Sequence, residues 1–158
     1  MRIVLVHPRI PQNAGAVARL AAATQSELVL VRPLGFRVDS AAVRRAGVDY
    51  WENVKMEVVS DLREVLNRAT GNIYFFSRFA KRSFWDATYT ADDTLVFGSE
   101  DEGLPEDVRN SIAEENLLRI PIVNPSVRSL NLATSVSIAL YEAMRQVDKN
   151  QEITYNQK

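Results

Sequence analysis

Asn13 and Arg19 belong to the first of three segments in which polar residues directly follow a short apolar run. Pro8 and Pro11 shape a loop there, and Asn13 then lies near the N-terminus of a predicted helix, whose free backbone N–H groups attract anions. Arg19 follows about one and a half turns further along that helix, so its side chain can return toward the same cleft. A helix-capping Asn and a surface Arg are the purely structural alternative.

The second segment is an acidic turn between two glycines, again after an apolar run. Gly98 and Gly103 permit a close approach of the backbone to a ligand. Glu100 can accept a hydrogen bond from an amine or a hydroxyl, whereas Asp101 and Glu102 are expected to face water. The segment is neither a P-loop, because no Gly-Lys-Ser/Thr follows, nor a GxGxxG dinucleotide fingerprint.

The third segment joins an apolar run, a polar loop and a long helix that opens at Ser129 or Asn131. Ser129, Leu130 and Asn131 place backbone donors and small polar side chains at the N-terminus of that helix. Ser and Asn are also common helix caps, so capping alone is the alternative. All three segments follow a predicted strand, and α/β folds bind ligands where strands end.

Short apolar runs alternate with amphipathic stretches, which predicts an α/β fold with a parallel sheet and helices on both faces. The predicted strands are Arg2 to His7, Glu27 to Val31, Asn72 to Ser77, Thr94 to Gly98 and Leu117 to Ile122. The predicted helices are Ala14 to Thr24, Ser40 to Ala46, Asp61 to Ala69, Glu106 to Glu115 and Ser129 to Val147. Ser60 or Asp61 suits a helix start, and Gly47 and Gly71 suit helix ends.

The composition is that of one globular domain, and we assign residues 1–158 to it, with a polar tail from about residue 149. The 158 residues are 46% hydrophobic and 25% charged. With no cysteine and one histidine, the chain excludes disulfides, thiolate nucleophiles and cysteine-based metal sites, so no metal is expected. No apolar run is long enough for a signal peptide or a membrane span, which predicts a cytoplasmic protein.

The formal net charge of −1 hides a strong asymmetry along the chain. Residues 1–50 carry seven Arg against Glu27, Asp39 and Asp49, a net charge of +4. Residues 91–118 carry nine acids against Arg109, a net charge of −8. A basic surface that faces RNA and ordinary solvated helix faces explain such runs equally well.

The basic stretch around Arg78 also carries aromatic residues that could stack nucleobases. Residues 74–76 are expected in a buried strand, which leaves the later aromatic residues as candidates. These candidates are Phe79, Phe84 and Trp85, beside Lys81 and Arg82.

Taken in order, the three segments closely resemble the motifs of the SPOUT class of RNA methyltransferases, in its SpoU branch. The first resembles N-x-G…R, with Asn13, Gly15 and Arg19. The second resembles F-G-x-E-x-x-G-L-P, in residues 97–105, and the third resembles R-I-P-M…R-S-L-N-L-S, in residues 119–133. The resemblance covers nearly the whole chain.

Residues 33–36 and 45–51 further resemble the small single-domain subgroup that methylates the ribose 2′-oxygen of the wobble cytidine or uridine in tRNA. The chain departs from that subgroup at two places. Ala133 stands where a Ser is common, which would weaken a hydrogen bond at the helix start, and the loop from Val123 to Val127 is about one residue longer than in some members.

The resemblance implies a parallel sheet whose C-terminal part is tied in a deep trefoil knot, and a homodimer whose catalytic sites take residues from both chains. It implies S-adenosylmethionine as the methyl donor, bound at the knot without a metal, and the anticodon stem-loop of tRNA as the substrate. The implied cofactor-binding residues are Phe76, Ser77, Gly98, Glu100, Gly103, Ile120, Pro121, Ile122, Ser129 and Leu130. The implied catalytic residues are Asn13, Arg19, Glu100, Ser129 and Asn131.

The resemblance also implies that Arg19 assists removal of the proton from the ribose hydroxyl. An arginine gives up its own proton only at great cost, so we expect Arg19 to orient the ribose or a phosphate and to stabilise developing alkoxide character. His7 titrates near neutrality and is the alternative base, although a structural histidine is commoner at a strand end. The alternative functions are methylation at another tRNA or rRNA position, or RNA binding by a knotted protein without catalysis.

Overall fold

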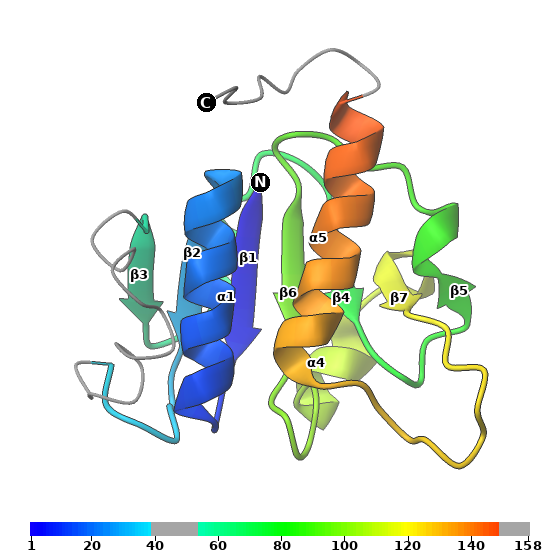
Figure 1. The fold of residues 1–158 in the computed structure, drawn as a ribbon, viewed down its shortest axis with the longest axis horizontal. Helices are drawn as coiled ribbons and strands as arrows, with labels where there is room; N and C mark the ends of the chain where they lie inside the picture. Colours follow the sequence, from blue (N-terminus) through cyan, green and yellow to red (C-terminus); the bar gives the residue numbers. More distant parts are fainter. Residues whose placement is uncertain (39–53, 149–158) are drawn as a thin grey trace.

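Seven parallel strands form one sheet at the centre of the computed structural model, which describes residues 1–38 and 54–148 (Figure 1). The strands are β1 (Arg2–Val6), β2 (Glu27–Val31), β3 (Met56–Val59), β4 (Ile73–Phe76), β5 (Arg82–Ser83), β6 (Thr94–Phe97) and β7 (Leu117–Arg119). Their order across the sheet is β3-β2-β1-β6-β4-β7-β5, and each neighbouring pair is parallel. The carboxyl ends of the strands therefore meet at one edge.

Helices cover both faces of the sheet. On one face, α1 (Pro11–Thr24) and α5 (Leu132–Asp148) lie side by side (Figure 1). On the other face, α3 (Leu62–Leu66) and α4 (Glu106–Ser111) pack against the second core. Two short 3-10 turns, Phe84–Asp86 and Glu114–Asn116, interrupt the loops. Within residues 1–38 and 54–148, no helix has the length and apolar character that crossing a membrane requires.

Alternate residues of each strand contribute to two separate apolar cores, because successive side chains point to opposite faces of a sheet. Ile3 and Leu5 of β1 are fully buried in the core beside α1 and α5. Val4 and Val6 of the same strand are buried in the core beside α3. Since both faces are covered, the strands are continuous apolar runs, and this is the signal that located them in the sequence.

The predicted parallel sheet is confirmed, together with all five predicted strands. The strands end up to three residues earlier than predicted; β1, for example, stops before His7, whose φ of 54° takes the chain out of the extended conformation. Strands β3 and β5 were not predicted from the sequence. In β3 only Val59 is buried, and β5 has two residues, so neither gives an apolar run.

The predicted helices are confirmed in part. Asp61 caps α3, where its side chain accepts the backbone N–H of Arg63 at 2.9 Å, but the helix ends at Leu66. Gly71 is therefore no helix end; a Cβ there would lie 2.7 Å from the backbone of Asp92, so the glycine allows two loops to pack closely. The last helix starts at Leu132 instead of Ser129, and α4 ends at Ser111. The helix predicted at 40–46 and Gly47 lie outside the described residues.

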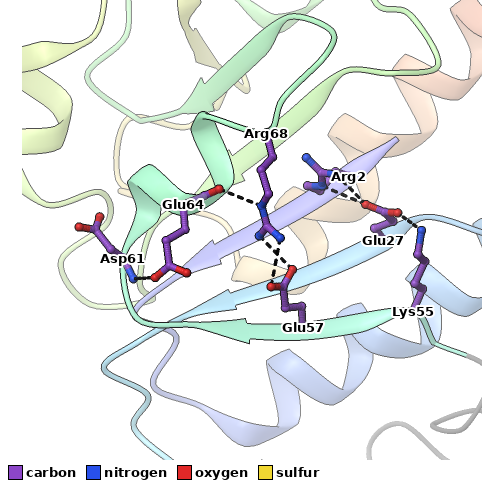
Figure 2. A network of polar contacts seen from close by, with 7 residues as sticks. All are labelled: Arg2, Glu27, Lys55, Glu57, Asp61, Glu64 and Arg68. Atoms are coloured by element: carbon purple, nitrogen blue, oxygen red, sulfur yellow. Dashed lines mark hydrogen bonds and ion pairs between the residues drawn. The ribbon is translucent and has the colours of Figure 1, made fainter.

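Charged side chains bridge the strands on the β3 side of the sheet (Figure 2). Glu27 of β2 accepts from Arg2 at 3.0 Å and also from Lys55, and the bond from Lys55 is the main reason why the pKa of Glu27 is lowered. Arg68 holds the carboxylate of Glu57 with two N–H donors at 3.2 and 3.0 Å. These charge pairs link β1 to β2, and β3 to the segment that follows α3.

Candidate active site

A pocket of about 380 Å³ opens at the carboxyl edge of the sheet. Its walls come from the loops after β1, β4, β6 and β7 and from the first turn of α5, so the three polar segments of the sequence meet there. The predicted site residues that line it are Asn13, Phe76, Ser77, Gly98, Glu100, Gly103, Ile120, Ile122, Ser129, Leu130 and Asn131.

The carboxylate of Glu100 ties the loop after β6 to the start of α1. Its Oε2 accepts the backbone N–H of Arg9 at 2.8 Å, and its Oε1 accepts the backbone N–H of Ile10 at 3.1 Å and Nδ2 of Asn13 at 2.9 Å. The anion expected at the N-terminus of this helix is therefore a side chain of the protein itself. A carboxylate has about four lone-pair positions, so about one is left to accept from a bound ligand.

Asn13 and Asn131 extend this contact to the start of α5. Nδ2 of Asn131 donates to Oδ1 of Asn13 at 2.9 Å, and Asn13 is itself 7% exposed. Oδ1 of Asn131 accepts the backbone N–H of Thr134 at 3.2 Å, which caps the helix. The first and third sequence segments are thus joined by one amide pair, and Asn131 caps the helix although Ala133 replaces the common Ser.

The turn between Gly98 and Gly103 is closed on itself. The backbone N–H of Ser99 donates to the carbonyl of Gly103 at 3.0 Å, and the reverse bond is also 3.0 Å. A Cβ at Gly98 would lie 1.9 Å from the Gly103 carbonyl carbon, so a side chain cannot occupy this position. Gly103 has a φ of 73°, a conformation that favours glycine. The Ser99 hydroxyl is the main reason why the pKa of Asp101 is lowered.

The pocket has apolar walls and a polar side. Ile120, Ile122 and Leu130 contribute aliphatic surface, and the rings of Phe76 and Phe97 stack at 4.5 Å between their centroids. Glu100 and the glycine turn contribute carboxylate and backbone groups. This combination fits S-adenosylmethionine, which has a flat purine, ribose hydroxyls and a positively charged methionine end.

Two predicted site residues do not line the pocket. Arg19 is exposed on α1 and is not part of the pocket wall. Pro121 lies between Ile120 and Ile122 but is not part of the wall. His7 lines a separate, smaller pocket of about 190 Å³ with Ser60 and Asp61, which gives no support to a role as the base.

The pocket rim also contains residues that the sequence analysis did not assign to it. Phe79, Arg109 and Arg128 line it, together with Arg78. Arg109 lies in the acidic segment, and only its charge, not a place at the site, was considered in the sequence. The prediction that Phe84 can stack a nucleobase is wrong, because its side chain is 2% exposed and packed in the core. In the described residues, no group of His, Asp or Glu side chains could hold a metal ion.

Comparison with known proteins places this geometry in a family. Residues 1–141 match the model of the SpoU rRNA Methylase family. A protein of Synechocystis sp. is 44% identical over 150 residues, which cover 93% of this chain and 97% of that protein. A Burkholderia cenocepacia protein named tRNA (cytidine(34)-2'-O)-methyltransferase is 40% identical over 147 residues, 91% of this chain and 94% of its own.

Solved structures agree with the sequence relatives. One, described as "Structural insights into the 2-OH methylation of C/U34 on tRNA", has a TM-score of 0.86 and 43% identity, and the match covers 92% of this chain and 94% of that one. The SpoU methyltransferase AviRb of Streptomyces viridochromogenes, solved in complex with AdoMet, shares the fold with a TM-score of 0.81 at 23% identity, over 92% of this chain and 57% of its own. With a family match over most of its length, the chain belongs to the SpoU rRNA Methylase family.

Proposed function

We propose that this chain transfers a methyl group from S-adenosylmethionine to the ribose 2′-hydroxyl of the wobble cytidine or uridine of tRNA. The relatives that cover nearly the whole chain are named for this reaction on cytidine 34, and a solved neighbour is described for C/U34. The observation that carries the proposal is the set of hydrogen bonds from Asn131 to Asn13 and from Asn13 to Glu100, which joins three distant segments around one pocket.

The residues of the pocket have separable tasks. S-adenosylmethionine, when bound, supplies a methyl group on a sulfonium, which an oxygen nucleophile can attack in line. The proposed cofactor-binding residues are Phe76, Ser77, Gly98, Glu100, Gly103, Ile120, Pro121, Ile122, Ser129 and Leu130. Glu100, Asn13 and Asn131 keep the loops in place around the reacting groups, so the ribose oxygen meets a preorganised site. Ser129 is exposed at the pocket, so its hydroxyl can donate a hydrogen bond to the substrate.

Arg19 acts, in this proposal, in the pocket of a second copy of the chain. It is exposed on α1 and does not line the pocket of its own chain, and in a homodimer it would reach the pocket of the partner. There it orients the ribose or a phosphate and stabilises negative charge that develops on the oxygen. The same proposal includes the C-terminal trefoil knot, a cytoplasmic location and contact with the anticodon stem-loop.

Mapping of the modified nucleotide tests the reaction. The purified protein is incubated with S-adenosylmethionine and tRNA from a strain that lacks the enzyme, and new 2′-O-methyl groups are located by nuclease digestion and mass spectrometry. A methyl group on the wobble ribose is the expected result. A methyl group at another position would keep the chemistry and overturn the substrate assignment, and no methylation would favour RNA binding without catalysis.

A mixed dimer tests the sharing of the site. Arg19→Ala is expected to abolish methylation while S-adenosylhomocysteine still binds. Chains carrying Arg19→Ala and Glu100→Ala are then coexpressed with different tags and the mixed dimer is purified. If Arg19 serves the partner, one of the two pockets has both residues intact and activity returns. An inactive mixed dimer, with both single variants folded, would show that Arg19 serves its own chain.

A further inference from the structure

Phe79 is a large apolar side chain that the fold leaves in water beside the candidate active site. It lines the pocket and is 59% exposed. The turn that carries it is well defined, because the backbone N–H of Phe79 donates to the Ser77 hydroxyl at 3.2 Å and that of Ala80 to the Ser77 carbonyl at 3.2 Å. Ser77 is itself anchored to β7 through the carbonyl of Leu118 at 2.9 Å.

Two guanidinium groups flank this ring. The guanidinium carbon of Arg78 lies 4.6 Å from the centroid of Phe79, and that of Arg109 lies 4.7 Å from it, both within the range of cation–π contacts. Arg109 reaches the ring from α4, about 30 residues further along the chain than Phe79. Arg78 makes no ion pair with another described residue, so its charge is available to a ligand.

An aromatic ring among arginines matches the chemistry of an unpaired nucleotide. Single-stranded RNA is bound by stacking its bases on aromatic rings and guanidinium planes, while arginines neutralise its phosphates. A protein partner would have to bury the guanidinium groups of Arg78 and Arg109, and removing a charge from water is costly.

We propose that Phe79, with Arg78 and Arg109, forms an RNA-binding ledge that stacks the unpaired nucleotide next to the one being methylated and contacts its phosphate. The inference rests on the proposed function and deepens it, since it names residues that hold the RNA at the pocket rim. Of the other aromatic residues nearby, Phe84 is buried, and Trp85 is 63% exposed but does not line the pocket. The ledge therefore accounts for binding of the target region and leaves the chemistry to the residues inside the pocket.

Steady-state methylation by Phe79→Ala tests the ledge, with Trp85→Ala as the matched control. Loss of one stacked base is expected to raise the KM for tRNA about tenfold in Phe79→Ala, with kcat changed less than about twofold. The Kd of S-adenosylhomocysteine should not change, and Phe79→Tyr should restore the KM because it keeps the ring. An unchanged KM in Phe79→Ala, or an equal rise in Trp85→Ala, would overturn the proposal.

The salt dependence of binding separates the cations from the ring. Arg78→Gln should lower the slope of log K against log salt concentration by about one, because one phosphate contact is lost, whereas Phe79→Ala should leave the slope unchanged. An unchanged slope in Arg78→Gln would remove the phosphate contact from the proposal. If the wild-type protein methylates no tRNA, the proposed function fails; if it methylates tRNA and these variants behave like it, only the ledge fails.

Discussion

Asp93 and Glu100 are carboxylates at opposite ends of the same strand, β6, and they have different roles. Asp93 is fully buried before the strand, where it accepts the backbone N–H groups of Asn72 and Thr90 and the hydroxyl of Thr90, each at 2.8 Å. Glu100 is partly exposed after the strand and accepts from residues 87 to 91 positions away in the sequence.

The comparison shows how a single chemical group serves stability at one end of a sheet and function at the other. Asp93 satisfies the donors of nearby turns and does not line the candidate active site, so it fixes the loops at the amino edge. Glu100 joins loops that are far apart in the sequence, and it lines the pocket. The two carboxylates should therefore respond differently to removal.

Removal of Asp93 should give the largest loss of stability. Asp93→Ala removes a fully buried carboxylate and leaves the N–H groups of Asn72 and Thr90 without their acceptor, which should lower the free energy of unfolding by about 4 kcal/mol. Urea unfolding at pH 7 measures this loss. The folded fraction should keep the wild-type kcat, and a variant that is fully stable but inactive would reverse the roles assigned to the two carboxylates.

Removal of Glu100 should act mainly on activity. Glu100→Ala frees the Arg9 and Ile10 N–H groups and Asn13, so kcat/KM should fall about 100-fold, or about 2.7 kcal/mol. The free energy of unfolding should change by less than about 1.5 kcal/mol, since water can reach these partly exposed donors. Single-turnover methylation and urea unfolding, both measured on Glu100→Ala and on Asp93→Ala, compare the two carboxylates directly.

Two glycines of the turn after β6 provide a second contrast within the pocket. Gly98→Ala places a Cβ 1.9 Å from Gly103, which must shift the turn and should weaken S-adenosylhomocysteine binding more than tenfold. At Gly103 nothing lies within 4 Å of an added Cβ, so Gly103→Ala should cost about 1 kcal/mol of backbone strain and little affinity. Calorimetric titration of both variants checks the order, and equal affinities would show that the turn adapts.

The smallest expected effect concerns pH. Burial is the main cause of the raised pKa of Tyr89, whose hydroxyl donates to the carbonyl of Phe84 at 2.9 Å. Above pH 10 the unfolded chain loses the tyrosine proton first, so the stability present below that pH declines as the pH rises. Unfolding at pH 8 and 10.5 should show a decline about 0.5 to 1 kcal/mol larger in the wild type than in Tyr89→Phe. Parallel declines would assign the alkaline loss to other groups.

The sequence predicted most of what depends on local pattern. Five strands stood out because a strand buried on both faces is a continuous apolar run, and Asp61 was a recognisable cap. Strand β3 was missed because Glu57 interrupts its short apolar pattern at the edge of the sheet. The neighbours Phe79 and Phe84 look alike in the sequence, yet one is 59% exposed and the other is 2% exposed.

The sequence by itself determined the order of the motifs, the family to which they belong and the parallel α/β architecture, since motif spacing and apolar runs are local properties. Only the tertiary structure decided that Glu100 fills the anion position at the start of α1, that Asn131 meets Asn13 and that Arg109 reaches Phe79. It also decided that Arg19 lies outside the pocket of its own chain. These contacts join residues far apart in the chain, and their partners are fixed by the order of strands across the sheet.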